Sequence, residues 1–114
     1  MVPQTLALMI ERQPCGYILA SSFNGALYVG VTSDLLRRIA RHRDGMFDGF
    51  TKRYGVKYFV YWEAFGTMEA AILREKQIKR WRRDWKRNLI ERDNPSWHDQ
   101  AVPLGLEPVA PSPA

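Results

Sequence analysis

Two tyrosines, an arginine and a histidine are placed so that their side chains could meet. Tyr17 and Tyr28 lie in two β-prone runs that a short loop joins into a hairpin. A helical pattern follows, in which Arg38 and His42 are four residues apart and therefore share one face. A sheet face with tyrosines and a helix face with two basic groups thus meet at one strand-to-helix turn.

The loop of this hairpin decides how near the two tyrosines come. Asn24-Gly25 favours a two-residue type I′ turn, which needs positive φ at both positions. With that turn Tyr17 is opposite Thr32, and the tyrosines share a face about 13 Å apart along the strands. They could then line one cleft without touching. A longer loop would change the offset, and a one-residue bulge would put them on opposite faces.

A carboxylate lies on the apolar face of a later helix. Ala71, Ile72 and Ile78 form the predicted inward stripe, and Glu75 is three residues after Ile72 and three before Ile78. A carboxylate in that position costs several kcal/mol unless it is paired, hydrogen-bonded or bound to a metal. From the residues alone we favour an ion pair with an arginine such as Arg38, and a metal ligand is the alternative.

Several chemistries are poorly supported. Two histidines and one cysteine without ligand spacing do not indicate a zinc site. No glycine-rich phosphate loop is present, and nothing fixes the geometry of a Ser-His-Asp triad. Phosphodiester hydrolysis fits better, because it needs a base for water, cations for the phosphoryl oxygens and help for the leaving oxygen.

Two tyrosine-containing triplets carry a family resemblance. The second is Tyr28-Val29-Gly30, and the first is Cys15-Gly16-Tyr17, which keeps the family's tyrosine but departs at its first two positions. Arg38 follows ten residues after Tyr28, and the chain continues with LREKQIKRWRRDWKRNLIERDNPSWHD. Together these features resemble the GIY-YIG nucleases, in particular their small single-domain bacterial branch, over residues 15–100.

The resemblance implies a role for each polar side chain. Tyr17 is the candidate general base or water-orienting group, and Tyr28 assists it by hydrogen bonding. Arg38 clamps the phosphate with its fork of donors, and His42 contacts the phosphate or relays a proton. Glu75 would be the metal ligand, holding one hard divalent cation, Mg²⁺ with Mn²⁺ as an alternative. With this match we favour the metal role of Glu75 over the ion pair.

Other residues are assigned to support and to nucleic-acid binding. Gly30 and a late asparagine support the site, and of Asn88 and Asn94 we prefer Asn94. Residues 73–92 contain nine Lys/Arg and three Asp/Glu, which predicts a basic face for a phosphate backbone. Trp81 and Trp85 should pack while these cations face nucleic acid. The predicted nucleic-acid-binding residues are Arg37, Arg41, Lys52, Arg53, Lys76, Lys79 and Arg83.

Bulk properties agree with a nucleic-acid partner. The chain has 114 residues, a formal net charge of +5 and a pI of about 9.7, which favour a polyanion. One cysteine rules out an internal disulfide and fits a reducing compartment. The apolar run LALMI near the start is too short for a signal peptide or a membrane span. We expect a soluble cytoplasmic protein, and a monomer.

The expected fold is α+β, with a three-stranded, mostly antiparallel sheet flanked by helices in the order β-β-α-β-α-α. Residues 1–14 should be an irregular lead-in, 15–100 the nuclease-like domain, and 101–114 a Pro-rich, disordered or loosely attached tail. The predicted strands are 16–22, 26–31 and 56–64, with the last one central, and the predicted helices are 33–43, 67–80 and 83–92. Ser33 or Thr32 is the predicted N-cap of the first helix, and Thr67 is that of the second.

Two functions from different classes follow. The first is a divalent-metal-dependent endonuclease that acts on DNA in repair or recombination. The second is a nucleic-acid-binding module on the same scaffold with little or no catalysis. The complete set of five polar side chains favours the enzyme, while branched, damaged, single-stranded and RNA substrates all remain open.

Overall fold

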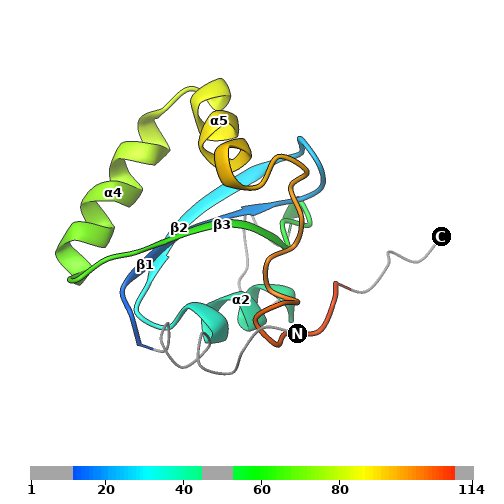
Figure 1. Ribbon diagram of the computed structural model, residues 1–114, viewed down its shortest axis with the longest axis horizontal. Helices are drawn as coiled ribbons and strands as arrows, with labels where there is room; N and C mark the ends of the chain where they lie inside the picture. The colour runs from blue at the N-terminus through cyan, green and yellow to red at the C-terminus, as the bar shows by residue number, and fades with distance from the viewer. Residues whose placement is uncertain (1–11, 45–52, 110–114) are drawn as a thin grey trace.

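The computed structural model describes residues 12–44 and 53–109. Its three-stranded antiparallel sheet has the order β2-β1-β3. Helix α2 covers one face, and α4 and α5 cover the other (Figure 1). The predicted α+β class and element order are confirmed. The elements are β1 (Cys15–Ala20), β2 (Leu27–Thr32), α2 (Leu35–Arg43), β3 (Tyr58–Ala64), α4 (Met68–Arg80) and α5 (Arg83–Asp93).

The central strand is β1, so the prediction that residues 56–64 form the central strand is wrong. All six residues of β1 are buried, because the strand is paired on both edges and covered on both faces. Strand β3 is at an edge, and its end residues Tyr58 and Ala64 are exposed. Its aromatic, β-branched composition indicated a strand correctly but did not indicate the strand's place in the sheet.

The hairpin loop is longer than the two-residue turn that Asn24-Gly25 predicted. The strands pair only from Ala20 opposite Leu27, so residues 21–26 form the loop. Asn24 has a φ of 57°, but Gly25 is not left-handed. The Gly25 amide donates to the Ser22 carbonyl at 3.0 Å, which closes a different turn. The type I′ prediction and its register are therefore wrong.

The longer loop shifts the register and brings the two tyrosines together. Tyr17 is opposite Gly30, and Leu19 is opposite Tyr28. Tyr17 and Tyr28 consequently lie on one face of the sheet, offset by two residues rather than four. The sequence analysis noted that a longer loop would change this offset. The observed loop reduces it and lets the two rings approach each other.

The sheet separates two apolar clusters. On the α2 side lie Cys15, Tyr17, Leu19, Leu35, Ile39, Val56, Phe59, Ala101 and Leu104. On the α4–α5 side lie Ile18, Ala20, Val29, Val60, Tyr61, Ile78, Leu89, Ile90 and Trp97. A bulge in β3 sends both Val60 and Tyr61 to the second cluster, because Ile18 pairs with Tyr61 and the next residue, Leu19, pairs with Phe59.

The helix ends match the predictions in part. Asp34, rather than Thr32 or Ser33, is the N-cap of α2, and its side chain accepts from the Arg37 amide. The predicted N-cap of α4, Thr67, is confirmed by its hydrogen bond from the Ala70 amide at 3.1 Å. The predicted break between the last two helices is also confirmed, since α4 ends at Arg80 and α5 begins at Arg83.

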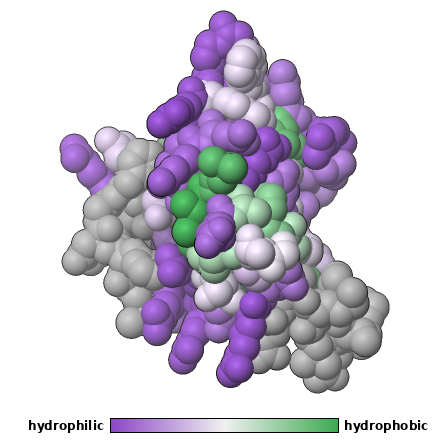
Figure 2. Space-filling view, turned by 90° about the vertical axis from the view of Figure 1, so that its left-hand side faces the viewer, coloured by the Kyte–Doolittle hydropathy of each residue, from purple (hydrophilic) through white to green (hydrophobic). Residues whose placement is uncertain are grey.

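One residue of the predicted inward stripe of α4 faces solvent. Ala71 and Ile78 are buried, but Ile72 is 36% exposed and its neighbour Leu73 is 63% exposed. The stripe that packs on the sheet is therefore narrower than predicted. Figure 2 shows the face at the left of Figure 1, where a small apolar area is surrounded by hydrophilic side chains.

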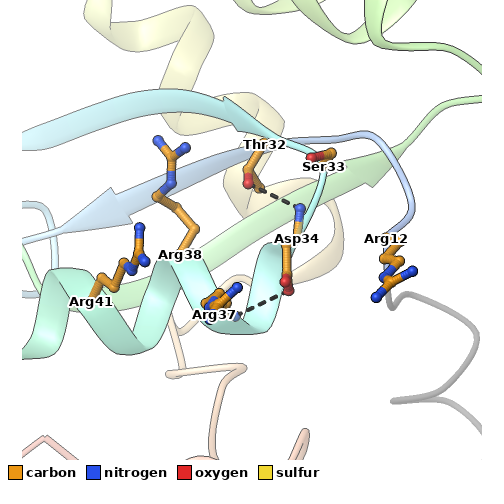
Figure 3. A pocket seen from close by; sticks show the side chains of 7 residues that line it. All are labelled: Arg12, Thr32, Ser33, Asp34, Arg37, Arg38 and Arg41. Carbon is orange, nitrogen blue, oxygen red and sulfur yellow. Dashed lines mark hydrogen bonds between the residues drawn. The ribbon is translucent and has the colours of Figure 1, made fainter.

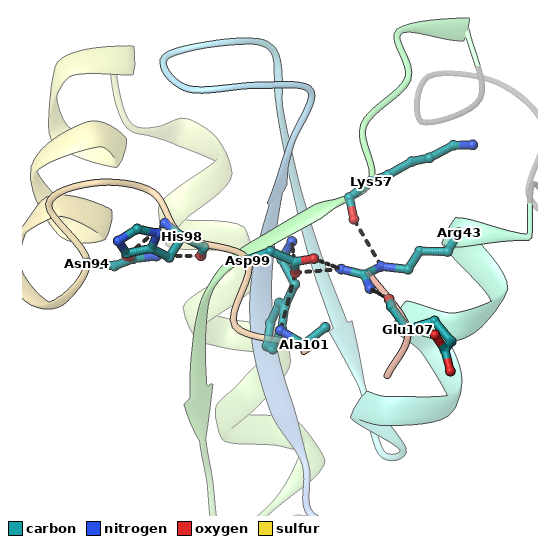
Figure 4. A network of polar contacts seen from close by, with 8 residues as sticks. Arg43, Lys57, Asn94, His98, Asp99, Ala101 and Glu107 are labelled. Carbon is teal, nitrogen blue, oxygen red and sulfur yellow. Dashed lines mark hydrogen bonds and ion pairs between the residues drawn. The ribbon is translucent and has the colours of Figure 1, made fainter. Parts of the chain in front are cut away.

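The chain after α5 returns along the β3 edge to the α2 side of the sheet (Figure 1). The Gln100 amide donates to the Phe59 carbonyl at 2.7 Å, and Asp99 forms an ion pair with Arg43 of α2 (Figure 4). Ala101 and Leu104 are buried in the α2-side cluster. The expectation of a loosely attached tail from residue 101 is therefore wrong for its first residues.

Asn94 anchors this return. The residue is 5% exposed, and its amide nitrogen donates to the carbonyls of Val60 and His98 at 3.0 and 2.9 Å. Its oxygen accepts from the His98 amide at 2.9 Å. Asn94 thus follows the end of α5, as predicted, and joins β3 to the returning segment.

In the described ranges, 12–44 and 53–109, we find no helix with the length and apolar character needed to cross a bilayer.

We expect Asn94→Ala to lower the free energy of unfolding by about 2–4 kcal/mol, because it leaves buried backbone groups without partners. Denaturant unfolding followed by circular dichroism measures this change. Asn88→Ala is the matched control, because Asn88 is exposed and its loss should cost no more than about 0.5 kcal/mol. Equal effects of the two substitutions would contradict the anchoring role of Asn94.

Candidate active site

Tyr17 lies at the centre of the site, on the α2 face of the central strand. Its side chain is 1% exposed. The residue directly opposite is Gly30, where an added Cβ would be 2.4 Å from both Cζ and Oη of Tyr17. The phenol therefore lies across the backbone of β2 at a position that only glycine leaves open. Gly30 leaves open the space in which the Tyr17 ring lies.

The Tyr17 hydroxyl is hydrogen-bonded to His42. Its oxygen is 3.0 Å from Nε2 of His42, which is 5% exposed in the last turn of α2. Tyr28 completes a group of three rings, with centroid distances of 6.3 Å to Tyr17 and 5.3 Å to His42. The structure therefore brings together the two tyrosines and the histidine that the sequence singled out.

The surroundings keep this pair uncharged in the free protein. Burial raises the pKa of Tyr17, and Tyr28 and Glu75 raise it further, while the charge and hydrogen bond of Arg38 lower it. Burial, followed by the charge of Arg38, lowers the pKa of His42 to about 4. At neutral pH the phenol therefore keeps its proton, and the imidazole is neutral and able to accept one.

Arg38 lines a pocket of about 390 Å³ near the pair of Tyr17 and His42 (Figure 3). Four arginines line it, together with the residues at the start of α2. Its single acidic residue, Asp34, is engaged as the helix cap. The pocket therefore suits an anion. Its lining residues are Arg12, Thr32, Ser33, Asp34, Arg37, Arg38 and Arg41.

Sequence reasoning missed Arg12. The residue lies in the stretch that we predicted as an irregular lead-in, yet it faces the pocket (Figure 3). The observed register explains its position, because Cys15 at the start of β1 pairs with Thr32 at the end of β2. A cation placed three residues before β1 therefore enters next to the start of α2.

Glu75 approaches the site from the opposite layer. Its side chain is 14% exposed, and it forms an ion pair with Lys79 at 3.5 Å, one turn along α4. Helix α4 packs on β2 and β1, and β2 is an edge strand. The carboxylate is near enough to raise the pKa of Tyr17. Glu75 thus has a carboxylate in the electrostatic field of the site and a weak, half-exposed cationic partner.

The donor set limits what kind of metal the site could hold. Within residues 12–44 and 53–109, no three His, Cys, Asp or Glu side chains gather into a metal-binding group. One carboxylate does not make a cage for zinc or calcium. It fits a hard divalent cation that keeps several waters and takes its other ligands from substrate oxygens.

The residues predicted to bind nucleic acid lie in different parts of the structure. Arg37 and Arg41 line the arginine pocket, and Lys76 and Lys79 are exposed on α4. Arg53 is exposed with its guanidinium over the Tyr54 ring, and Lys52 lies outside the described residues.

Arg83 and Asn94 have structural partners. Arg83 donates to the carbonyls of Asn24 and Gly25 at 2.7 Å, so it closes the hairpin loop. Asn94 joins β3 to His98 in the network of Figure 4, and Asn88 lies exposed on α5. The hydrogen bonds of both residues contribute to holding the fold together.

A family comparison agrees with this geometry. Residues 13–88 match the family model described as the GIY-YIG catalytic domain. The chain belongs to the GIY-YIG family. This is a nuclease family, so the resemblance noted from the two triplets is confirmed. The matched region includes β1, β2, α2, β3 and α4, and with them all five polar side chains of the candidate site.

Individual relatives of this GIY-YIG chain are UPF0213 proteins. One from Haloquadratum walsbyi is 36% identical over 75 residues, covering 66% of this chain and 83% of that protein. One from Staphylococcus saprophyticus is 37% identical over 67 residues, covering 59% and 82%. The solution NMR structure of a UPF0213 protein from Bacillus halodurans has 29% identity and a TM-score of 0.49, covering 76% of this chain and 92% of that one.

The lowered pKa of His42 predicts a pH-dependent stability. Unfolded chains take up the histidine proton near pH 6.5, whereas the folded protein takes it up only near pH 4. The unfolded state therefore binds more protons between these values, and stability falls as the pH falls through them. Between pH 6.5 and pH 4 the protonation of His42 should lower the free energy of unfolding by about 3 kcal/mol, at about 1.4 kcal/mol per pKa unit.

The measurement compares wild type with His42→Gln by denaturant unfolding at pH 7, 5.5 and 4. Carboxylates titrate in both proteins and cancel in the difference. The stability of the wild type relative to the variant should decrease steadily with decreasing pH. A difference that does not change with pH would show that His42 is not held neutral by its surroundings.

Proposed function

We propose that this GIY-YIG chain is a divalent-cation-dependent nuclease that hydrolyses phosphodiester bonds in DNA. The observation that carries the proposal is the buried hydrogen bond between the Tyr17 hydroxyl and Nε2 of the neutral His42. A phenol with its own proton acceptor, next to an arginine pocket, has the parts needed to deprotonate water beside a phosphate.

The raised pKa of Tyr17 constrains how it can act. A free tyrosinate is disfavoured, so the phenol must pass its proton on as it accepts one from water. In this scheme the water oxygen attacks phosphorus, the water proton goes to the Tyr17 oxygen, and the phenol proton goes to Nε2 of His42. The bond between phosphorus and the leaving ester oxygen breaks, and that oxygen takes a proton from a solvent water. His42 afterwards returns its proton to solvent. The neutral imidazole supplies the necessary lone pair. The negative charge of the substrate phosphate offsets the imidazolium that forms.

The arginine pocket positions the phosphate and stabilises its charge. Arg38 lowers the pKa of Tyr17 and also lines the pocket, so its guanidinium is near both the phenol and the anion site. Its planar fork can contact two phosphoryl oxygens as negative charge develops. Arg37 and Arg41 from the same helix, and Arg12 from before β1, hold the adjacent backbone.

Glu75 is the residue that would hold the cation, Mg²⁺ with Mn²⁺ as an alternative. When bound, a hard divalent cation neutralises charge on the phosphoryl and leaving oxygens. The chain contributes one carboxylate, at 14% exposure and beside Lys79, and the remaining ligands are waters and substrate oxygens. Because the Lys79 pair is half exposed, little stability is lost when Glu75 exchanges this partner for a cation.

We place this activity in the cytoplasm, with a part in DNA repair or recombination and a monomer as the working unit. The single cysteine, Cys15, is buried and free, which fits a reducing compartment. A binding module without catalysis is the competing proposal. Incubation with labelled duplex, branched, damaged and single-stranded DNA and with RNA, with and without Mg²⁺ or Mn²⁺, decides between the two.

Tyr17→Phe should abolish cleavage and leave nucleic-acid binding and the fold intact, because it removes one oxygen and keeps the ring packed over Gly30. Cleavage of the best substrate in the panel should fall by about 100-fold or more. Tyr61→Phe is the control, since Tyr61 is also buried and hydrogen-bonded but belongs to the other apolar cluster. A Tyr17→Phe protein that cleaves at the parent rate removes Tyr17 from the mechanism.

Glu75→Gln separates a metal ligand from a structural ion pair. If Glu75 holds the cation, divalent-dependent cleavage is lost while the free energy of unfolding changes by less than about 1 kcal/mol, because the Lys79 pair is half exposed. Glu69→Gln is the matched control, an exposed carboxylate in the first turn of the same helix. A large loss of stability with unchanged cleavage per folded molecule would refute the metal assignment.

A further inference from the structure

An exposed tryptophan lies at the corner between α4 and α5, outside the candidate active site. The sequence predicted that Trp81 and Trp85 both pack, but Trp85 is 49% exposed. Trp81 is half buried and packs against the α4–α5-side cluster. Large apolar side chains exposed singly are common, so the surroundings of Trp85 decide what its ring can do.

The local backbone holds the two rings against each other. Trp81 ends α4 and Arg82 precedes α5, both in extended conformations, so the chain turns sharply between the helices. The indole rings meet edge to face, with centroids 6.0 Å apart and an interplanar angle of 79°. Trp81 is fixed from its other side by Arg74, whose guanidinium lies over its ring and is bound to Glu63. Trp85 therefore stands on a rigid support.

A groove of about 380 Å³ runs beside the rings. Trp85, Asn88 and Arg92 are spaced i, i+3 and i+7, so one face of α5 presents a ring, an amide and a guanidinium in a row. Trp81 and Leu89 complete the lining. An amide offers both donors and acceptors to the edge of a planar heterocycle, and a guanidinium suits a phosphate.

The charge around the groove selects a polyanion. Residues 79–92 carry seven Lys/Arg and two Asp/Glu, a net charge of +5 over the helix corner. Arg82, with a 72% exposed side chain, already lies over the Trp85 ring at 5.2 Å. A guanidinium therefore covers one face of the ring, and because Arg82 is exposed, a planar group can take its place on that face at small cost.

We propose that the Trp85 groove binds an unpaired nucleobase of a single-stranded segment. The base stacks on Trp85, Asn88 contacts its edge, and Arg92 contacts the neighbouring phosphate. This inference rests on the proposed function, because it assigns the nuclease a substrate with a single-stranded or frayed part. A duplex keeps its bases stacked inside and offers the groove only phosphates, whereas stacking on tryptophan tolerates any base in a single strand.

The test measures binding in EDTA, so that cleavage does not enter. The probes are a fluorescently labelled 30-nucleotide oligothymidylate, the same backbone with abasic sites, and a blunt duplex. The longest dimension of the protein is 43 Å, and a stacked strand advances about 3.4 Å per nucleotide, so the oligonucleotide can span the molecule. The variants are Trp85→Ala, Trp85→Phe and, as an exposed apolar control on α4, Leu73→Ala.

Trp85→Ala should weaken oligothymidylate binding by about 5- to 100-fold, as expected for the loss of one base–aromatic stack. Binding of the abasic strand and of the duplex should be unchanged. Trp85→Phe should keep most of the affinity, and Leu73→Ala all of it. Circular dichroism confirms that each variant is folded.

Equal effects of Trp85→Ala on the abasic and base-containing strands, or no effect on either, would overturn the inference. Such a result would assign the groove to phosphates alone or to a protein partner. The cleavage assays with Tyr17→Phe answer a separate question. Cleavage without base-dependent binding would refute only the proposal that the groove binds a base. Base-dependent binding without cleavage would refute only the proposed nuclease activity.

Discussion

The position of the Tyr17 ring across Gly30 is the contact on which the site depends. A residue with a Cβ at position 30 would meet Tyr17 ring atoms at 2.4 Å, and interiors at normal packing density do not absorb such an overlap without movement. With glycine there, the phenol reaches over β2 to His42 on α2. The absence of a side chain at Gly30 thus sets the direction in which the Tyr17 hydroxyl points.

Burial of that polar group then determines the chemistry. A phenol and an imidazole placed between sheet and helix lose contact with water, and each shifts toward its neutral form. Arg38 cannot lose its charge, so it remains the cation at the mouth of the site and disfavours a second positive charge on His42. The neutral, proton-accepting state of His42 follows from packing and from one neighbour.

Local patterns in the sequence were sufficient for the elements and for the family. Helical periodicity and the Thr67 cap located α4, and the interval from Tyr17 to Tyr28 and Arg38 indicated the family. The register could not be obtained in this way. Asn24-Gly25 favours a tight turn locally, but the hydrogen bonds of residues 21–26, including the one that the Ala26 amide donates to Ser21 Oγ, make a longer loop.

Other features depended on contacts between distant parts of the chain. Asn94 was assigned to the site, yet its partners Val60 and His98 show it as the anchor of the returning segment. A helical pattern cannot reveal which face a C-terminal segment will cover. For the same reason Arg12, in an apparently irregular stretch, and the exposure of Trp85 were found only once the elements were packed.

The sheet order explains how residues from opposite layers could contribute to the one proposed site. Tyr17, His42 and Arg38 belong to the α2 layer, whereas Glu75 belongs to α4 on the other face. If β2 were central, a further strand would lie beyond it and would block the way around its edge from one layer to the other. Because β2 is instead the edge strand and α4 packs on β2 and β1, groups from both layers can converge around its outer edge. The buried run of β1, which takes the centre and displaces β2 to the edge, is therefore a condition for the shared site as well as for the core.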